Sequence, residues 1–324
     1  MKAKNQFDLR KLGDSGLKVT AVGLGVMQFS GSDGIWRFIF DDMQQQEMHA
    51  IVKAALEGGI NWFDTAEMYG RGRSEEGLAS GLQAAGEADD DVRIATKWMP
   101  LLRTARNIGR TIDTRKKYLK PYSIDLYYVH NPMGFSSPEA EMDAMVDLVE
   151  AGDIRTVGVS NFDEQRMRRA SAALAERGIP LAANQMEYSL LNREIETNGV
   201  LEAARELGVT IVAYSPLARG LLTAKFHRDP ETLQNTPIGR RLYLQRMIDE
   251  TRPLIEVLEA IAASHDVTPA QVALNWLIQI QGETVVVIPG ASSVSQAEEA
   301  AGVMHFKLTE AEINQLEELT RKYR

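Results

Sequence analysis

The chain contains no cysteine, few histidines and no excess of positive charge, and each of these absences excludes a class of function. Without cysteine there is no disulfide, no thiolate metal ligand and no cysteine nucleophile. The formal net charge of -9 disfavours a general role in binding nucleic acids or membrane surfaces, because both are polyanions. The five histidines are scattered, so we expect no metal site. Chemistry must therefore use oxygen and nitrogen side chains.

Long apolar runs are also missing. No uninterrupted apolar stretch approaches the roughly 18 residues that a membrane-spanning helix needs, and the first residues, MKAKNQFDLRKLG, carry positive charge with no apolar stretch behind them. We therefore expect a cytoplasmic protein. Its 324 residues, 44% of them hydrophobic, can bury a large core either as two ordinary domains or as one α/β barrel.

Short apolar segments rich in β-branched residues do recur, and helical patterns separate them. Apolar residues at helical spacing over 48–56 end at the pair Gly58 and Gly59, and two similar patterns end at Gly152 and Gly208. The expected strands are 22–25, 60–64, 92–97, 124–130, 156–160, 181–185, 209–214 and 285–289. Near-continuous apolar strands alternating with helices predict a parallel sheet, and eight such units favour a single (β/α)8 TIM barrel domain over residues 1–324.

Both ends of the chain carry further signals. The turn-rich sequence between Leu9 and Val19 predicts an N-terminal β-hairpin that closes the bottom of the barrel. Helix starts are predicted at Thr268 and Thr309, each with a capping box, and we expect the C-terminal helix to pack on the barrel. The longest irregular stretches are expected at 28–42 and 218–252, where they follow strands and so lie on the functional face.

Four polar residues, most of them placed where an apolar run ends, are the candidate chemistry. They are Asp64, Tyr69, Lys97 and His130. Each has a simpler explanation, such as a capping box of Asp64 with Glu67, a half-buried aromatic, a surface lysine or a hydrogen-bonded core histidine. Because strand ends of a barrel converge on one face, we instead expect the four to surround one pocket.

The chemistry of these four groups suits carbonyl reduction. We expect a buried Lys97 ammonium, held by Asp64, to favour the phenolate of Tyr69 and so to lower the pKa of Tyr69 from about 10 toward neutrality, which makes the phenol a usable general acid. A neutral His130 imidazole can donate a hydrogen bond to a carbonyl oxygen and orient it. Such a site lacks only a hydride donor.

With these residues in view, nearly the whole chain resembles the aldo-keto reductase family. The resemblance is carried by Gly23-Leu24-Gly25, 64–70 (DTAEMYG), Lys97, His130, 158–162 (GVSNF), Asn184-Gln185, 214–217 (YSPL) and 288–290 (IPG). It implies an (α/β)8 barrel that reduces aldehydes or ketones with a nicotinamide cofactor. Tyr69 is then the proton donor, Asp64 and Lys97 tune it, and His130 places the carbonyl.

The same resemblance implies a set of cofactor-binding residues. Ser160, Asn161 and Gln185 would bind the carboxamide and Tyr214 would stack on the nicotinamide ring, although Asn161 could instead cap a helix with Glu164. Ser215, Leu217, Arg219 and Gly220 fall in the segment expected to cover the pyrophosphate, and Gly290, Ser292, Gln296 and Glu298 in the segment expected at the adenosine end. The glycines at 23 and 25 do not form a Rossmann fingerprint, because Gln28 occupies the third glycine position.

The sequence departs from the family pattern at the adenosine end. Where the family usually carries a lysine or arginine for the 2'-phosphate of NADP, this chain has Ala291, Ser292 and Ser293, and Ala300 replaces a frequent asparagine. Loss of a charge-assisted contact forfeits about 1.5 to 3 kcal/mol. We therefore expect NADP as cofactor with NAD as an alternative. A simple capping box from Ser293 to Gln296 is the competing interpretation.

Two further hypotheses concern the loops. The segment from Arg219 to Arg246 is basic against an acidic background and predicts a mobile cofactor clamp, with a solvated loop as the alternative. Apolar residues in or beside strand-following loops predict a pocket for aromatic or aliphatic carbonyls. They are Trp36, Phe38, Phe40, Trp98, Met99, Met133 and Phe135.

Two other functions stay open on the sequence alone. One is a Schiff-base aldolase or isomerase with Lys97 as nucleophile. The other is a non-catalytic nicotinamide-binding subunit or redox sensor. The substrate, the direction of the reaction and the oligomeric state are not specified by the sequence.

Overall fold

The computed structural model describes residues 7–31, 42–235 and 238–324. Its strands are β1 (Arg10–Lys11), β2 (Lys18–Val19), β3 (Leu24–Gly25), β4 (Trp62–Asp64), β5 (Arg93–Trp98), β6 (Leu126–Val129), β7 (Thr156–Ser160), β8 (Leu181–Glu187), β9 (Thr210–Tyr214) and β10 (Val285–Val287). Its helices are α1 (Gln45–Glu57), α2 (Arg73–Ala85), α3 (Arg106–Leu119), α4 (Pro138–Glu150), α5 (Glu164–Ala175), α6 (Val200–Glu206), α7 (Lys225–Arg228), α8 (Ile238–His265), α9 (Pro269–Ile280), α10 (Val294–Gly302) and α11 (Glu310–Thr320).

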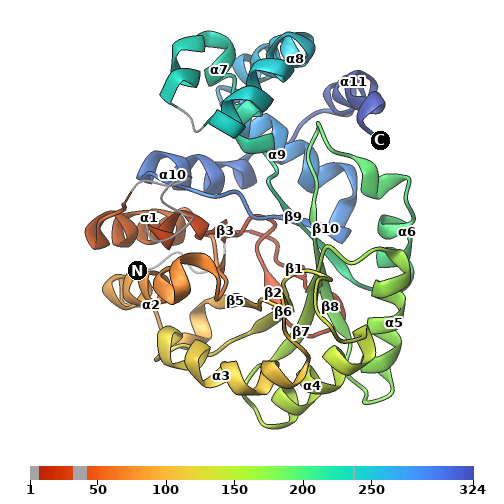
Figure 1. Cartoon of the computed structure of the whole chain (residues 1–324). Coiled ribbons are helices and arrows are strands. Elements are labelled where there is room, and N and C mark those ends of the chain that lie inside the picture. Colours follow the sequence, from red (N-terminus) through yellow and green to blue (C-terminus); the bar gives the residue numbers. More distant parts are fainter. Residues whose placement is uncertain (1–6, 32–41, 236–237) are drawn as a thin grey trace.

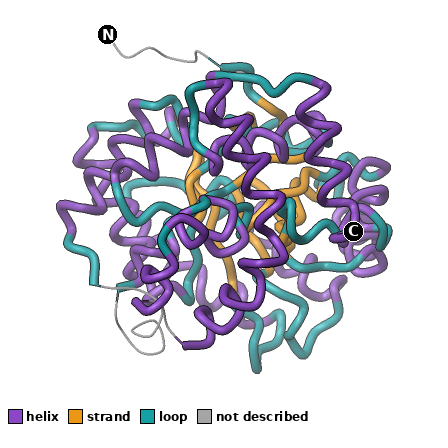
Figure 2. The backbone as a smooth tube through the Cα atoms, turned by 90° about the horizontal axis from the view of Figure 1, so that it is seen from above, coloured by secondary structure: helices purple, strands orange, loops and turns teal. Residues whose placement is uncertain are grey.

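Strands β3 to β10 form one parallel sheet of eight strands in sequence order, and the sheet closes on itself. Parallel bridges join Val22 to Val287 and Gly25 to Gly290, which links the first strand to the last. Figure 2 shows the strands gathered at the centre with helices around them. All eight expected strands are present, so the predicted (β/α)8 barrel is confirmed.

The N-terminal hairpin closes the end of the barrel at which the strands begin, as predicted. β1 pairs with β2, and Leu12 and Val19 join the buried cluster inside the barrel. The Gly13 amide donates to Thr210 Oγ1 at 2.8 Å, at the start of β9. A Cβ at Gly13 would lie 2.6 Å from the carbonyl oxygen of Ala182, so only glycine fits here. Arg10 adds hydrogen bonds to the carbonyl oxygens of Ile278 at 2.6 Å and Gly282 at 2.9 Å.

One expectation about the loops is wrong. The stretch 218–252 is largely helical rather than irregular, because it contains the 3-10 helices Ala218–Thr223 and Pro230–Asn235, α7 and the first half of α8. Helix α8 contains Pro253 without ending there. In Figure 1, α7 and α8 lie together outside the ring of helices that surrounds the strands. Of the stretch 28–42, residues 32–41 lie outside the described part of the chain.

The predicted helix starts are confirmed, and the C-terminal helix packs on the barrel. Capping boxes are present at Thr268, which begins α9, and at Thr309, which begins α11. Across residues 7–31, 42–235 and 238–324, none of the helices combines the length and the apolar character that crossing a bilayer requires.

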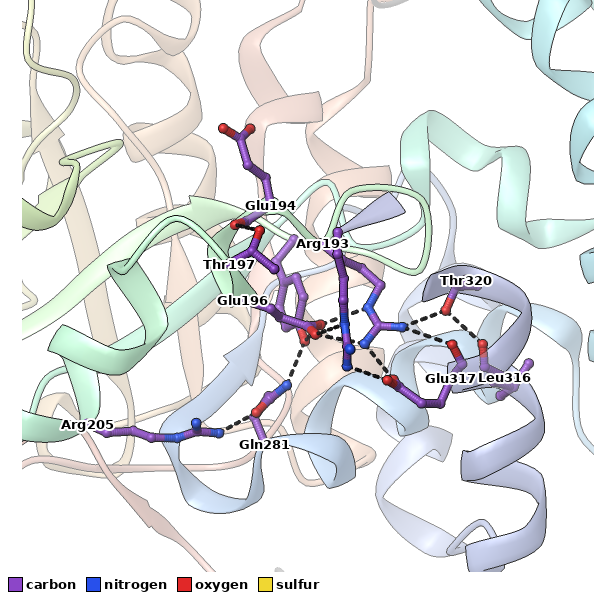
Figure 3. A network of polar contacts seen from close by, with 11 residues as sticks. Arg193, Glu194, Glu196, Thr197, Arg205, Gln281, Leu316, Glu317 and Thr320 are labelled. Carbon is purple, nitrogen blue, oxygen red and sulfur yellow. Dashed lines mark hydrogen bonds and ion pairs between the residues drawn. The ribbon is translucent and has the colours of Figure 1, made fainter. Parts of the chain in front are cut away.

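A buried arginine fastens α11 to the loop after β8. The Arg193 side chain is fully buried, and its guanidinium donates to both carboxylate oxygens of Glu196 at 2.8 and 2.7 Å, to Glu317 and to Thr320 Oγ1 at 2.9 Å. It also lies over the Trp276 ring, 4.9 Å from the centroid. Figure 3 shows the guanidinium between the two glutamates. A fully partnered charge at this position holds the C-terminal helix in place.

Replacing Arg193 by Met should lower the free energy of unfolding by about 3 kcal/mol, because Glu196 and Glu317 then lose their fully buried cation and keep only the more exposed Arg324 as a partner. Urea denaturation monitored by circular dichroism measures this change. The matched control is Arg321→Met, which removes an exposed pair with Glu318 and should change the stability by less than about 1 kcal/mol. Equal effects of the two substitutions would contradict the assignment.

Candidate functional site

The carboxyl ends of the barrel strands carry the polar residues predicted from the sequence. Asp64 ends β4, Lys97 lies next to the end of β5 and His130 directly follows β6. On the other side, Ser160 ends β7 and is paired in register with Gln185 of β8, and Tyr214 ends β9. Because parallel strands bring their carboxyl ends to one edge, these side chains share one face of the barrel.

Asp64 and Lys97 form a buried ion pair at the centre of this face. Lys97 Nζ binds Asp64 Oδ1 and also donates to the Thr65 carbonyl oxygen at 2.7 Å, while Gln185 Nε2 donates to Asp64 Oδ2 at 2.8 Å. Burial raises the pKa of Asp64 and lowers the pKa of Lys97, and the charge of each partner opposes the shift of the other. Both carboxylate oxygens and the ammonium are therefore partnered, which fixes the pair in one geometry.

Tyr69 lies beside this pair and is nearly buried, with 9% of its surface exposed. Lys97 Nζ lies 5.1 Å from the centroid of the Tyr69 ring, and the His130 ring meets the Tyr69 ring edge-on with centroids 5.7 Å apart. Asp64, Tyr69, Lys97 and His130 are thus brought together as predicted. The expected fall in the pKa of Tyr69 is wrong: burial, and then the Asp64 carboxylate, raise the pKa of Tyr69 above its ordinary value. The phenol stays protonated at neutral pH.

A glycine-rich turn fixes Tyr69 in this place. Gly70 and Gly72 have φ of 61° and 102°, and Arg71 between them is also left-handed, with φ of 55°. A Cβ on Gly70 would lie 2.3 Å from the Ser30 carbonyl oxygen, and one on Gly72 would lie 2.2 Å from the Tyr118 ring. Only glycine fits at these two positions, so the turn has little freedom to move Tyr69.

His130 is held as a neutral imidazole. Burial, and then the positive charge of Lys97, lower the pKa of His130 to about 3. Its Nδ1 atom is buried and has no hydrogen-bond partner within the described residues. A neutral ring beside the phenol can donate one hydrogen bond to a carbonyl oxygen without adding a charge to the site.

The four residues expected at the nicotinamide form one hydrogen-bonded chain. Tyr214 OH donates to Asn161 Oδ1 at 2.9 Å, and Asn161 Nδ2 donates to Ser160 Oγ at 3.1 Å. Ser160 Oγ donates to the Gln185 carbonyl oxygen at 3.0 Å, and the Gln185 side chain reaches Asp64. This series of hydrogen bonds therefore connects Tyr214 to the Asp64–Lys97 ion pair.

Asn161 does not cap a helix. The N-cap of α5 is Asp163, whose side chain accepts from the Arg166 amide at 2.8 Å. Asn161 is instead left-handed, with φ of 58°, and its amide group turns toward Ser160 and Tyr214. Its side chain is therefore committed to the site rather than to the start of α5.

The segment after β9 has an unusual backbone. Ser215, Ala218 and Arg219 have φ of 50°, 46° and 58°, which side chains rarely adopt, and Gly220 has φ of 91°. The Ala218 amide donates to the Ser215 carbonyl oxygen and the Gly220 amide to the Leu217 carbonyl oxygen, each at 2.9 Å, so this backbone folds into two tight turns. The segment also borders a groove of about 500 Å³. Only the glycine at 220 signals this shape in the sequence.

At the expected adenosine end, the polar groups mostly bind one another. Gln296 Oε1 accepts from the Ser292 amide at 2.8 Å and from Ser292 Oγ at 3.1 Å. Ser293 caps α10 by accepting from the Gln296 amide at 3.3 Å, so only half of the expected capping box is present. Gly290 packs against the Gln28 amide, and the Glu298 side chain is exposed on α10. These residues follow one another along the sequence, but they do not converge on one point as the residues around the Asp64–Lys97 ion pair do.

The basic segment is more ordered than a solvated loop. Arg228 of α7 pairs with Glu259 of α8 at 2.6 Å, and Arg246 lies exposed on α8. The side chain of Arg240 lies outside the described part of the chain.

The apolar residues expected in a substrate pocket separate into three groups. Trp98 is fully buried and belongs to the core. Met133 and Phe135 are exposed, by 56% and 70%. Met99 is half-buried, and Trp36, Phe38 and Phe40 lie outside the described residues.

Sequence reasoning missed the role of Glu67, which does not form a capping box with Asp64. Its carboxylate is buried, forms an ion pair with Arg103, accepts from the Met99 amide at 2.8 Å, and lies 3.3 Å from Arg115 Nη1. A signal was present in the sequence, because Arg115 interrupts the buried stripe of Ile108, Ile112 and Leu119 on α3. A cation within an apolar stripe indicates a buried acid nearby.

Within the described ranges, no group of three or more acidic or histidine side chains is arranged to hold a metal ion.

Comparisons with known proteins agree with this geometry. The family model for the aldo/keto reductase family matches residues 21–321. The chain is 36% identical over 311 residues to an uncharacterized oxidoreductase of Mycobacterium tuberculosis, covering 95% of this chain and 91% of that protein. It is 31% identical over 323 residues to the aldo-keto reductase yakc [NADP(+)] of Schizosaccharomyces pombe, covering 95% and 90%.

A solved structure gives the same result in three dimensions. The thermostable aldo-keto reductase Tm1743, in complex with the inhibitor epalrestat, has a TM-score of 0.76 and 30% identity, and the match covers 96% of this chain and 99% of that one. The fold, the strand-end residues and the match over nearly the whole sequence lead to one conclusion: the chain belongs to the aldo/keto reductase family.

Proposed function

We propose that this oxidoreductase reduces aldehydes or ketones to alcohols by hydride transfer from NADPH, with NADH as the alternative donor, in a single barrel domain spanning residues 1–324. The observation that carries the proposal is the buried, protonated Tyr69 beside a neutral His130 and the Asp64–Lys97 ion pair. When bound, the nicotinamide supplies the hydride that reduces the carbonyl carbon.

In this proposal the protein donates one proton to the substrate's carbonyl oxygen and orients that oxygen with a hydrogen bond. Tyr69 donates its phenolic proton to the carbonyl oxygen as negative charge develops there. His130 donates a hydrogen bond to the same oxygen. Lys97, 5.1 Å from the ring centroid of Tyr69, stabilises the phenolate that forms, so its charge acts in the transition state more than in the resting phenol.

The residues near the ion pair fit a nicotinamide. The chain from Tyr214 through Asn161 and Ser160 to Gln185 offers amide and hydroxyl groups that match the donor and acceptor of a carboxamide, and the Tyr214 ring offers an aromatic face. For the pyrophosphate we propose the segment from Ser215 to Gly220, because the cationic side chain of Arg219 is exposed there.

The adenosine end supports NADP less strongly. One polar contact available there is the Ser292 hydroxyl, which already donates to Gln296, so a 2'-phosphate competes for that donor. We propose NADP as the preferred cofactor because a relative with that cofactor in its name is 31% identical over 95% of this chain, and NAD as a second cofactor.

The Schiff-base alternative has weaker support. Lys97 Nζ is fully buried and directed at two acceptors, Asp64 and the Thr65 carbonyl oxygen, rather than presented as a free amine. A nucleophilic lysine needs its lone pair directed at the substrate.

Replacing Tyr69 by Phe should lower kcat for carbonyl reduction by a factor on the order of 10² to 10⁴, because the variant lacks the donated proton. The Kd for NADPH, measured by fluorescence titration, should be unchanged. The matched control is Tyr128→Phe, since Tyr128 is also buried and its ring lies 5.9 Å from Lys97 Nζ. Full activity of Tyr69→Phe would exclude Tyr69 as the acid. Covalent trapping of substrate on Lys97 by borohydride would favour the aldolase.

The pH profile of kcat/KM should have no inflection near pH 6.5. The pKa of His130 lies at about 3, so the imidazole is already neutral above roughly pH 4 and does not change charge in this range. Steady-state assays from pH 5 to 8 measure the profile. An inflection near 6.5 that disappears in His130→Gln would show that the ring titrates in the working range.

Arg219→Ala should weaken binding of both reduced cofactors by roughly tenfold, since a charged hydrogen bond to a phosphate oxygen contributes about 1.5 kcal/mol or more. Titration of NADPH and NADH in parallel gives both constants and also the cofactor preference. Arg228→Ala serves as the control, because its guanidinium is occupied by Glu259. Unchanged constants in Arg219→Ala would remove this segment from the cofactor site.

A further inference from the structure

Two neighbouring loops at the mouth of the barrel expose apolar side chains. Of the six large hydrophobic residues that are exposed within the described ranges, four lie here: Leu101, Leu102, Met133 and Phe135, with 45%, 75%, 56% and 70% of their surface exposed. We call these four residues the apolar rim. Exposed apolar residues that gather in one place are characteristic of a binding surface.

The two loops are fastened to each other. The Phe135 amide donates to the Arg103 carbonyl oxygen at 2.9 Å, and the Ala105 amide donates to Ser136 Oγ, also at 2.9 Å. They follow β5 and β6, which carry Lys97 and lead into His130. The loop at 99–105, which we call the rim loop, is therefore joined directly to the loop that carries Met133 and Phe135.

The apolar rim is close to the reaction centre. Leu101 follows Lys97 by four residues and Met133 follows His130 by three, so their Cα atoms lie within about 14 Å and 11 Å of those residues, even for a fully extended chain. A large aromatic or alkyl group attached to a carbonyl can therefore extend from the catalytic residues toward the apolar rim.

One buried carboxylate links the rim loop to the loop that carries Tyr69. Glu67 lies two residues before Tyr69, and its Oε1 atom binds both the Met99 amide, at 2.8 Å, and the Arg103 guanidinium. The Glu67 amide donates in turn to the Lys97 carbonyl oxygen at 3.2 Å. The other carboxylate oxygen, Oε2, is anchored by Arg115 of α3. Glu67 therefore contacts both ends of the rim loop segment from Met99 to Arg103.

We propose that Glu67 is a positioning residue: by holding the rim loop against the Tyr69 loop, it sets where the apolar part of a carbonyl substrate lies relative to the proton donor. The inference rests on the proposed carbonyl reduction and adds to it a substrate class, carbonyls with a bulky apolar substituent. A small aldehyde does not reach the apolar rim and does not depend on Glu67 in this way.

The test compares a bulky with a small substrate. For 4-phenylbenzaldehyde, Glu67→Gln and Arg103→Met should each raise KM about tenfold, whereas KM and kcat for propanal should change less than twofold. Glu67→Gln keeps the shape and removes the charge, and Arg103→Met removes the guanidinium contact at one end of the rim loop while the Met99 amide bond at the other end remains. Arg103→Lys restores a cation opposite Glu67 and should recover most of the affinity for the bulky aldehyde.

Arg177→Met is the matched control, because it removes an exposed ion pair between the turn after α5 and Glu150 at the end of α4, and it should leave both substrates unaffected. Equal changes in KM for the two aldehydes, or a fall in kcat for both, would overturn the inference and assign Glu67 a general structural role. If Glu67→Gln does not fold, Arg103→Met with its lysine rescue decides. Failure of the proposed function is recognised separately, by undiminished reduction in Tyr69→Phe.

Discussion

The buried ion pair between Asp64 and Lys97 is the interaction on which the rest of the site depends. Moving two charges out of water costs several kcal/mol for each, and their attraction offsets this only when the remaining hydrogen-bonding positions are also filled. Here the Gln185 side chain donates a hydrogen bond to the second carboxylate oxygen of Asp64, and the Thr65 carbonyl oxygen accepts a second hydrogen bond from the Lys97 ammonium. The pair thus requires three strands, β4, β5 and β8, in fixed register. A barrel supplies that arrangement because its strands cannot slide independently.

The same burial selects neutral forms for the two groups beside the pair. Tyr69 keeps its proton because a phenolate would be poorly solvated and would face the Asp64 carboxylate, and His130 stays unprotonated because a cation would be poorly solvated and would face Lys97. One charged pair surrounded by neutral hydrogen-bonding groups leaves room for charge to develop during a reaction. Burying these groups costs free energy of folding. The preorganised hydrogen-bond donors then stabilise the negative charge that develops on a carbonyl oxygen during the reaction.

Much of this could be predicted from the sequence, for a physical reason. Strand ends are visible where an apolar run meets a polar residue, as at Asp64 or Ser160, and a parallel barrel brings all such ends together. The rise in the pKa of Tyr69 could not be predicted, because it depends on how completely the ring is buried. The left-handed backbone at Ala218 and Arg219 carries no residue signal, since tertiary contacts impose it. The first half of helix α8 falls in the stretch 218–252, which was expected to be irregular.

The hairpin that closes the bottom of the barrel has a consequence for synthesis of the chain. Its Arg10 and Gly13 bind groups that lie far away in sequence, at Ile278, Gly282 and Thr210. These partners are synthesised long after the hairpin residues, so the hairpin cannot dock until they have been made. Until then Leu12 and Val19 remain exposed. The floor of the barrel can therefore be completed only after β9 and α9 have been synthesised, so the barrel stays open at that end until both are present.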